Sequence, residues 1–340
     1  MDLSRHDYIL KCIVDYFIKT ATPVGSSTLI EKYHLPYSSA TIRNEMALLE
    51  AQGLIEKTHI SSGRIPSSKG YHYYIENLKT QDVDEEIKSK LAVILSAKAK
   101  SVEDVIKDSC EMISHMTNLA SVVLGPNANE ESLLSVQIIP LSPNSATAVF
   151  VTDKGYVENK TFVFDSNIDI NDVQKCVEML NSRLKGTRIS ELIDKMEAMR
   201  PLIATYVKSN DVIYRAFVEA FVKFASERVS LFGTENLLEQ PEFADDAYKM
   251  KKMLKFIESP SKVSEILDDS EDMVIRIGDD EGNLGLDDVT VISRKIPLGK
   301  SKGTIALVGP TRMDYEMVVN ALDYLAEELE KFFGDGKDDE

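Results

Sequence analysis

Apolar residues recur at helical spacing near the start of the chain. Between Arg5 and Ile18 they occupy one face of a helix, at the spacing i, i+3, i+4, i+7 and i+8. The positions on this face are Ile9, Cys12, Ile13, Tyr16 and Phe17. Pro23 and Gly25 end the pattern, because neither residue suits a helix interior. We therefore expect a second, short helix to follow over residues 27–33.

A third helix is expected after the stretch HLPYSS. Ser38 or Ser39 can accept hydrogen bonds from the free backbone N–H groups of its first turn. Gly53 is a typical residue for its end. Its inward-facing positions are Ile42, Met46 and Leu49. Three helices with two tight connections predict a helix-turn-helix unit.

The pattern then changes from helix to strand. LIEKTHI is typical of a strand, SSG is typical of a turn, and RIP begins a return strand that Pro66 closes. A helix-turn-helix followed by a β-hairpin is the arrangement of a winged helix. We expect this winged helix-turn-helix DNA-binding domain to occupy residues 1–80.

Charge separates this segment from the rest of the chain. The 340 residues carry a net charge of -17, and 28% are charged while 43% are hydrophobic, which indicates a globular protein. Residues 1–80 hold nine Lys or Arg and eight Asp or Glu, whereas the other 260 residues hold 30 and 48. Only the first 80 residues are therefore electrostatically suited to meet a polyanion such as DNA.

Polar side chains concentrate at the start of the third helix and on the hairpin. Recognition helices read bases from their N-terminal turns, where Arg suits guanine and Asn suits adenine. Lys57 and Arg64 on the hairpin can reach phosphate or a minor groove. The candidate DNA-binding residues are Ser38, Ser39, Thr41, Arg43, Asn44, Lys57, Arg64 and Lys69. The alternative is a solvated helix face that is merely capped by serines.

The rest of the chain alternates between helix and strand patterns. A charged amphipathic linker helix is expected within residues 81–100. Strand patterns lie on both sides of a mostly helical stretch at about 171–257. They occur at 133–142, 145–155, 156–164, 273–278, 288–298 and 303–309. This distribution predicts an α+β multidomain fold in which one domain is interrupted by an insertion, and a charged tail at 335–340 ends the chain.

Enzyme motifs fail at identifiable positions. Gly299, Lys300 and Ser301 resemble the end of a phosphate-binding loop, but the glycine required five residues before Gly299 is Arg294. The acidic stretch GDDEGN lacks the register of a calcium-binding loop. The five histidines do not pair with one another or with cysteine at ligand spacing. We expect no catalytic residue, no metal site and no cofactor.

Other signals concern the compartment. No apolar run approaches the roughly 20 residues that a membrane-spanning helix needs, and MDLSRHDYIL lacks the core of a signal peptide. We therefore expect a cytoplasmic protein without a membrane partner. Cys12, Cys110 and Cys176 are widely spaced and flanked by apolar residues, which favours buried thiols in a reducing compartment.

Three separated stretches resemble the HrcA family of bacterial heat-inducible transcription repressors. They are SSATIRNEMALLEAQGLIEKTHISSGRIPS at 38–67, GTENLLEQPEF at 233–243 and GTIALVGPTRMDY at 303–315. Because they occur in the same order on a chain of matching length, the resemblance covers nearly the whole protein. Two departures stand out. The hairpin reads HISSGRIP, where the family pattern is closer to HTSAGRVP. The stretch IRIGDD follows the family pattern up to Gly278 and departs from it afterwards.

The resemblance implies a GAF-like α+β domain over residues 101–184 and 241–334, with an inserted helical dimerisation module at 185–240. It also implies a homodimer that binds an inverted-repeat DNA operator, the CIRCE element ahead of chaperone operons, and releases it on heat stress. The GroEL chaperonin is the implied partner that keeps the repressor competent to bind.

Aromatic and aliphatic residues of the implied module form an apolar helix face. Such a face can be internal core or a subunit interface, and we favour the interface because a helical insertion has little core of its own. The candidate dimer-interface residues are Tyr206, Ile213, Tyr214, Phe217 and Phe221. The alternative function is a small-molecule-responsive winged-helix regulator whose GAF-like domain binds a metabolite.

Overall fold

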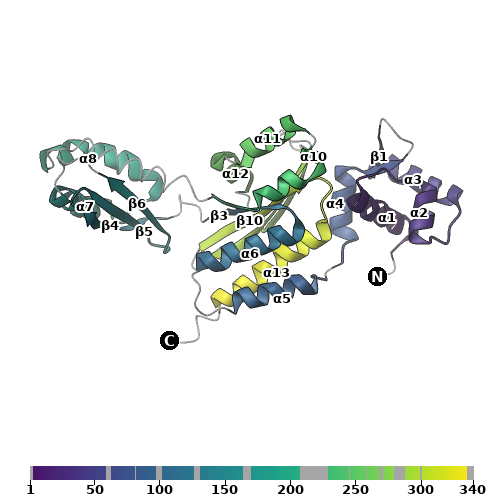
Figure 1. Cartoon of the computed structure of the whole chain (residues 1–340), viewed down its shortest axis with the longest axis horizontal. Coiled ribbons are helices and arrows are strands. Elements are labelled where there is room, and N and C mark those ends of the chain that lie inside the picture. The colour runs from purple at the N-terminus through teal and green to yellow at the C-terminus, as the bar shows by residue number, and fades with distance from the viewer. Residues whose placement is uncertain are drawn as a thin grey trace.

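The structure is a computed structural model that arranges the chain in an N-terminal unit, a central unit and an inserted unit (Figure 1). The residues that it describes are 3–58, 63–80, 82–96, 102–125, 131–163, 170–206, 229–244, 246–257, 259–267, 271–278, 288–298 and 301–334. The fold is mixed α+β with several sheets, as the distribution of helix and strand patterns predicts.

Helices and a two-stranded antiparallel sheet form the N-terminal unit, residues 3–80. Its elements are α1 (Arg5–Thr20), α2 (Ser26–Tyr33), α3 (Ser39–Ala51), β1 (Ile55–Lys57), β2 (Arg64–Pro66) and α4 (Ser68–Asn77). The Ser38 side chain caps α3 by accepting a hydrogen bond from the Thr41 N–H. Gly53 has a φ of 74°, a left-handed conformation that suits glycine at a helix end. Both local signals in the sequence are therefore confirmed.

The hydrophobic faces predicted for α1 and α3 point inward. Their buried members are Ile9, Cys12, Ile13, Ile42, Met46 and Leu49. Tyr16 and Phe17 are half-buried and pack against the same cluster. All three cysteines are buried, and burial raises the pKa of the Cys110 thiol to about 12, which keeps it protonated at neutral pH.

A five-stranded antiparallel sheet is the centre of the second unit. Its spatial order is β7 (Val229–Phe232), β3 (Ala120–Leu124), β10 (Ser301–Pro310), β9 (Val289–Leu298) and β8 (Met273–Ile277). Three longer helices cover one face, namely α5 (Glu85–Leu95), α6 (Val102–Thr117) and α13 (Tyr315–Gly334). Short elements cover the other face: η3 (Thr234–Glu239), α10 (Pro241–Ala244), α11 (Ala247–Ile257) and α12 (Pro260–Leu267).

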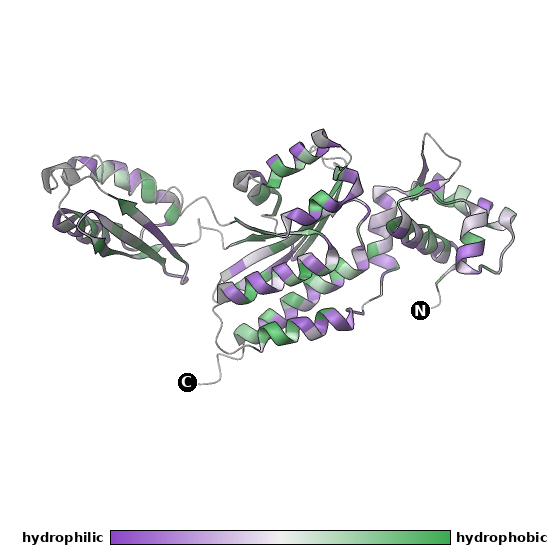
Figure 2. Cartoon of the chain, viewed as in Figure 1, coloured by the Kyte–Doolittle hydropathy of each residue, from purple (hydrophilic) through white to green (hydrophobic). Residues whose placement is uncertain are grey.

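Alternation along the strands explains how one sheet serves two layers. Val123 and Leu307 join the cluster under α5, α6 and α13, whereas their neighbours Val122 and Ala306 join the cluster under α11 and α12. Successive strand residues point to opposite faces, so both faces of this sheet are apolar. Figure 2 shows the matching alternation of polar and apolar stripes on the covering helices.

The helix expected as a linker within 81–100 is part of the central unit. It is α5, and it packs against α6 and α13, with Ile87 and Leu91 buried. Because of this apolar stripe, α5 both connects the N-terminal unit to the central unit and packs as one of the helices of the central unit.

The inserted unit differs from the predicted boundaries. It contains β4 (Leu133–Ser142), β5 (Ser145–Thr152), β6 (Val157–Val163), α7 (Ile170–Leu184), η2 (Ile189–Glu191) and α8 (Leu192–Tyr206). The three strands pair antiparallel in a sheet of their own, and their inner face shares a separate core with α7 and α8. Strands that we expected in the GAF-like domain at 101–184 thus belong to the insertion, which is α+β rather than helical.

The path of the chain through the central sheet explains this difference. β3 pairs with both β10 and β7, so the chain leaves the central sheet after Leu124 and re-enters it at Val229. The predicted insertion at 185–240 therefore begins too late, and β7 within that range belongs to the central sheet. Of the candidate dimer-interface residues, Tyr206 ends α8, and Ile213, Tyr214, Phe217 and Phe221 lie outside the described residues.

Candidate nucleic-acid interface

One face of α3 is exposed along its whole length. Its residues follow helical spacing and are Ala40, Arg43, Asn44, Ala47, Leu48 and Ala51. Arg43 is the single charged residue of this face. The three alanines leave room for the helix backbone to approach a flat or grooved partner closely, with Arg43 and Asn44 projecting from the second turn.

Hydroxyl groups organise the start of α3. The Ser38 hydroxyl lies 2.9 Å from that of Thr41 and also accepts from the Thr41 backbone N–H at 3.1 Å. The Ser39 hydroxyl lies 2.9 Å from the hydroxyl of Ser26 in α2. Arg43 donates from Nε to the same Ser26 oxygen at 3.4 Å. Ser26 and Ser39 therefore link α2 to α3, and Ser26 also holds the guanidinium end of the Arg43 side chain.

Glu50 of α3 holds both cations of the hairpin. Arg64 donates to its Oε2 from Nε at 3.0 Å and from Nη2 at 2.7 Å, and Lys57 Nζ lies 3.5 Å from its Oε1. The hydrogen bonds from Arg64 hold the pKa of Glu50 below its usual range. The Arg64 side chain is only 15% exposed, whereas that of Lys57 is 62% exposed. The hairpin is thus fastened to α3 through Arg64, and Lys57 is the more accessible cation.

The last candidate lies at the other end of α3. Lys69 Nζ donates to the carbonyl oxygen of Gln52 at 2.9 Å, which suits the negative end of a helix dipole. The structure therefore brings Ser38, Thr41, Arg43 and Asn44 together on one half of α3 and places Lys69 beyond its C-terminus.

Two residues of this surface were missed in the sequence. Leu48 is 54% exposed and lies one helical turn beyond Asn44 on the exposed face. Extending the exposed stripe by i+4 from Asn44 would have found it. Glu50 had no such signal, because its partners Lys57 and Arg64 reach it only when the hairpin folds back.

A buried carboxylate fixes the inner side of α3 to α1. Glu45 is 8% exposed and accepts from Arg5 Nε at 2.7 Å, while His6 Nδ1 lies 3.1 Å from its other oxygen. His6 Nε2 lies 3.0 Å from Gln52 Oε1. Burial lowers the pKa of His6, but the hydrogen bonds with Gln52 and Glu45 outweigh that effect, so its pKa is raised above the ordinary 6.5.

This clasp predicts a pH-dependent stability. Because the folded pKa of His6 is raised, its contribution to the free energy of unfolding is complete below about pH 6.5. It is lost as the pH rises through the folded value. Urea unfolding of the wild type and of His6→Gln between pH 5.5 and 8.5 measures it. The stability advantage of the wild type should shrink with rising pH, and parallel curves for the two proteins would contradict the prediction.

The described residues lack two features that mark other functional classes. None of the helices in that part of the chain carries an apolar stretch of the length that a membrane span requires. Across the same ranges, no three His, Cys, Asp or Glu side chains are grouped so that they could hold a metal ion.

Similarity to known proteins covers nearly the whole chain. A family model described as "HrcA protein C terminal domain" matches residues 103–319. The heat-inducible transcription repressor HrcA of Bacillus pumilus is 39% identical over 333 residues, 96% of each chain. The repressor of the same name from Halalkalibacterium halodurans is 36% identical over 336 residues, 98% of each chain. A crystal structure of a hypothetical protein aligns over 98% of this chain and 99% of its own, with a TM-score of 0.67 and 23% identity, which concerns the fold alone.

Proposed function

The chain belongs to the HrcA family of heat-inducible transcription repressors, and from this premise we propose that it represses by binding operator DNA through its N-terminal unit. The observation that carries the proposal is the exposed face of α3, with Arg43 and Asn44 on its N-terminal half. In this proposal the N-terminal unit is a winged helix-turn-helix. The first turns of α3 enter the major groove, and the β1–β2 hairpin lies along the backbone or the minor groove.

The charge distribution supports this division of roles. Residues 81–340 are acidic, so they gain little binding energy from the DNA phosphate backbone. Contacts with that backbone supply most non-specific affinity for DNA. Binding therefore depends on base contacts from Arg43 and Asn44, and Ser38, Ser39, Thr41 and Lys69 support α3. We propose Lys57 and Arg64 as phosphate contacts, with the condition that DNA competes with Glu50 for Arg64.

We further propose that the repressor acts as a homodimer on an inverted repeat, the CIRCE operator, because two-fold symmetry in the protein matches two-fold symmetry in the site. The central unit is the GAF-like domain of this proposal, and we propose the dimer contact at the candidate residues of the inserted segment, namely Tyr206, Ile213, Tyr214, Phe217 and Phe221. Heat removes the competent dimer, and the GroEL chaperonin restores it in the cytoplasm. Such a chaperone requirement suits a protein whose affinity rests on correct geometry rather than on bulk charge.

A footprint on DNA from the protein's own genome tests the function. We expect protection of a symmetric repeat upstream of chaperone genes, and added GroEL should increase the fraction of protein that binds. Protection of an asymmetric site, or of none, would contradict the proposal.

The clamp at Glu50 predicts a gain of affinity. Glu50→Gln removes a carboxylate beside the proposed DNA surface and releases Lys57 and Arg64 for phosphate contacts. Affinity for operator and scrambled DNA should both rise, and the plot of log K against log salt should steepen by about one unit. Glu76→Gln is the matched control, because it makes the same charge change on an exposed residue of a different helix, α4. An unchanged slope in Glu50→Gln would remove the hairpin cations from the interface.

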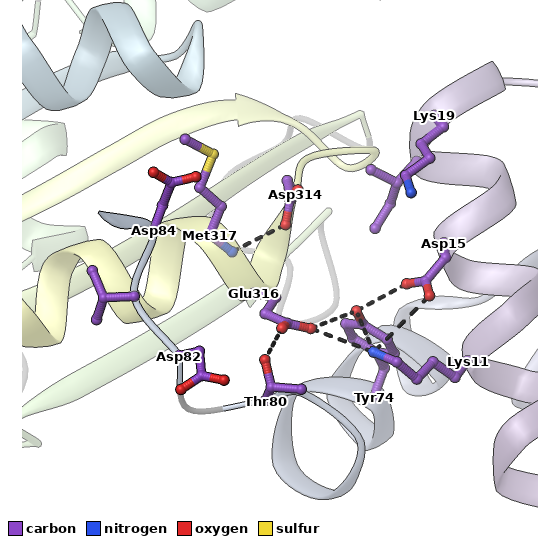
Figure 3. A pocket seen from close by; sticks show the side chains of 12 residues that line it. Lys11, Asp15, Lys19, Tyr74, Thr80, Asp82, Asp84, Asp314, Glu316 and Met317 are labelled. Carbon is purple, nitrogen blue, oxygen red and sulfur yellow. Dashed lines mark hydrogen bonds and ion pairs between the residues drawn. The ribbon is translucent and has the colours of Figure 1, made fainter. Parts of the chain in front are cut away.

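One cavity in the described part of the chain bears on the small-molecule alternative. A cavity of about 390 Å³ lies where the N-terminal and central units meet, lined by Lys11, Asp15, Tyr74 and Glu316 among others (Figure 3). These four side chains bond to one another, whereas ligand pockets are mostly apolar with a few convergent polar groups. The cavity therefore belongs to the junction between the units, and we do not propose a metabolite there.

A further inference from the structure

The N-terminal unit packs against the central unit through side chains of both units. The Tyr71 ring of α4 packs on the Tyr315 ring of α13, with centroids 4.8 Å apart. Buried Asn320 of α13 donates from Nδ2 to the carbonyl oxygens of Thr80 and Asp82, both at 3.0 Å. The hydrophobic cluster is also continuous from α1 and α4 into α13. The junction is therefore a packed interface and not merely a covalent tether.

Arg312, just before α13, is bonded across this junction. Its Nη1 donates to the carbonyl oxygen of Ile18 at 2.7 Å. Ile18 lies in the last turn of α1, where carbonyl groups lack partners within the helix and a cation suits the dipole. The other nitrogens of Arg312 donate to Glu242 of α10, from Nε at 2.7 Å and from Nη2 at 3.4 Å. The arginine side chain is 17% exposed and that of Glu242 is 23% exposed.

The two partners of Arg312 have different roles. Glu242 accepts from two nitrogens of the planar guanidinium, which sets the orientation of the fork. The remaining donor then meets α1 from a fixed direction. Lysine keeps the positive charge but reproduces this geometry only in part, because its single ammonium group has no planar fork.

A second group of contacts holds α1 to the central unit at Lys11, two helical turns before Ile18 (Figure 3). Glu316, in the first turn of α13, lies 3.4 Å from Lys11 Nζ. It also accepts from the hydroxyl groups of Tyr74, at 3.3 Å, and Thr80. Lys11 and Ile18 are about 10 Å apart along the axis of α1. Two attachment points at that separation oppose both tilting and sliding of α1 against the central unit.

We propose that Arg312 is a positioning residue for operator recognition: with Glu242 it fixes the orientation of the N-terminal unit on the body, and so sets the separation of the two α3 helices in a dimer. The inference rests on the proposed function. An inverted repeat presents its half-sites at one separation. A rigid junction selects that separation, whereas a loose junction lets each α3 bind its half-site independently of the other. The second binding event then loses the advantage of correct geometry.

Spacing selectivity tests the proposal directly. Full-length wild type, Arg312→Gln and Arg312→Lys are titrated against a single half-site. They are then titrated against inverted repeats whose central spacer is changed by one to five base pairs. Lys331→Gln is the matched control, because it removes one positive charge from an exposed site on α13. Glu242→Gln is a milder second variant that leaves Arg312 able to reach Ile18, and it keeps the test open if Arg312→Gln folds poorly.

We expect all variants to bind the half-site within about twofold of the wild type. The wild type and Lys331→Gln should show a sharp optimum of spacer length. Arg312→Gln should lose roughly tenfold in affinity at that optimum and give a nearly flat profile, and Arg312→Lys and Glu242→Gln should be intermediate. A sharp, unshifted optimum in all variants would overturn the proposal, as would a parallel loss of half-site affinity. A wild type with no preference for a repeat over a half-site would overturn the proposed function itself and this inference with it.

Discussion

Replacing Arg43 or Asn44 by alanine is expected to weaken operator binding by about 1 to 3 kcal/mol, or roughly 5- to 150-fold, while affinity for scrambled DNA stays nearly constant. Both side chains project from the exposed face of α3, and the structure uses neither to build the core. A bidentate contact with a base edge distinguishes one base pair from another, so its loss affects discrimination more than general affinity.

Titration of each variant against operator and scrambled repeats at one salt concentration measures the effect. Matched controls lie elsewhere in the chain. Asn77→Ala removes an exposed asparagine from α4, and Arg200→Ala removes an exposed arginine from α8. Both controls should keep the discrimination of the wild type. Equal discrimination in Arg43→Ala, Asn44→Ala and the controls would show that α3 does not read the operator.

Phe150→Ala should destabilise the inserted unit alone, by about 3 to 5 kcal/mol. Phe150 is fully buried on β5 and belongs to a core formed by β4, β5, α7 and α8. That core is separate from the two clusters of the central sheet in the part of the chain that the structure describes. The cavity left by the missing ring therefore weakens the packing of one unit only.

Calorimetry of the full chain measures this effect. The unfolding transition of the inserted unit should move to lower temperature in Phe150→Ala. The N-terminal and central units share a cluster and should unfold together in a second transition, which stays in place because Phe150 lies outside that cluster. Val163→Ala on β6 is the control, since Val163 is 77% exposed and its truncation should change little. An equal fall in the midpoint temperature of every transition in Phe150→Ala would show that the inserted unit unfolds together with the N-terminal and central units.

Short-range signals determined most of the N-terminal unit. The apolar spacing in α1 and α3, the Ser38 cap and the left-handed Gly53 each depend on residues within a few turns, and the structure contains all of them. The division of the chain into a near-neutral N-terminal segment and an acidic remainder is likewise a property of the sequence alone. These features were predictable because helix periodicity and capping are local interactions.

Long-range pairing was decided only by the tertiary structure. Strand periodicity shows which side of a strand is buried but not which sheet it joins, so β4, β5 and β6 could not be assigned to the insertion from their pattern. In the same way, Arg64 looked like a free phosphate contact until the hairpin brought it to Glu50. Arg312 and Glu242 lie 70 positions apart, in two stretches that carry the family resemblance. Their ion pair exists because the folded sheet and its covering helices bring α10 and the start of α13 against the end of α1.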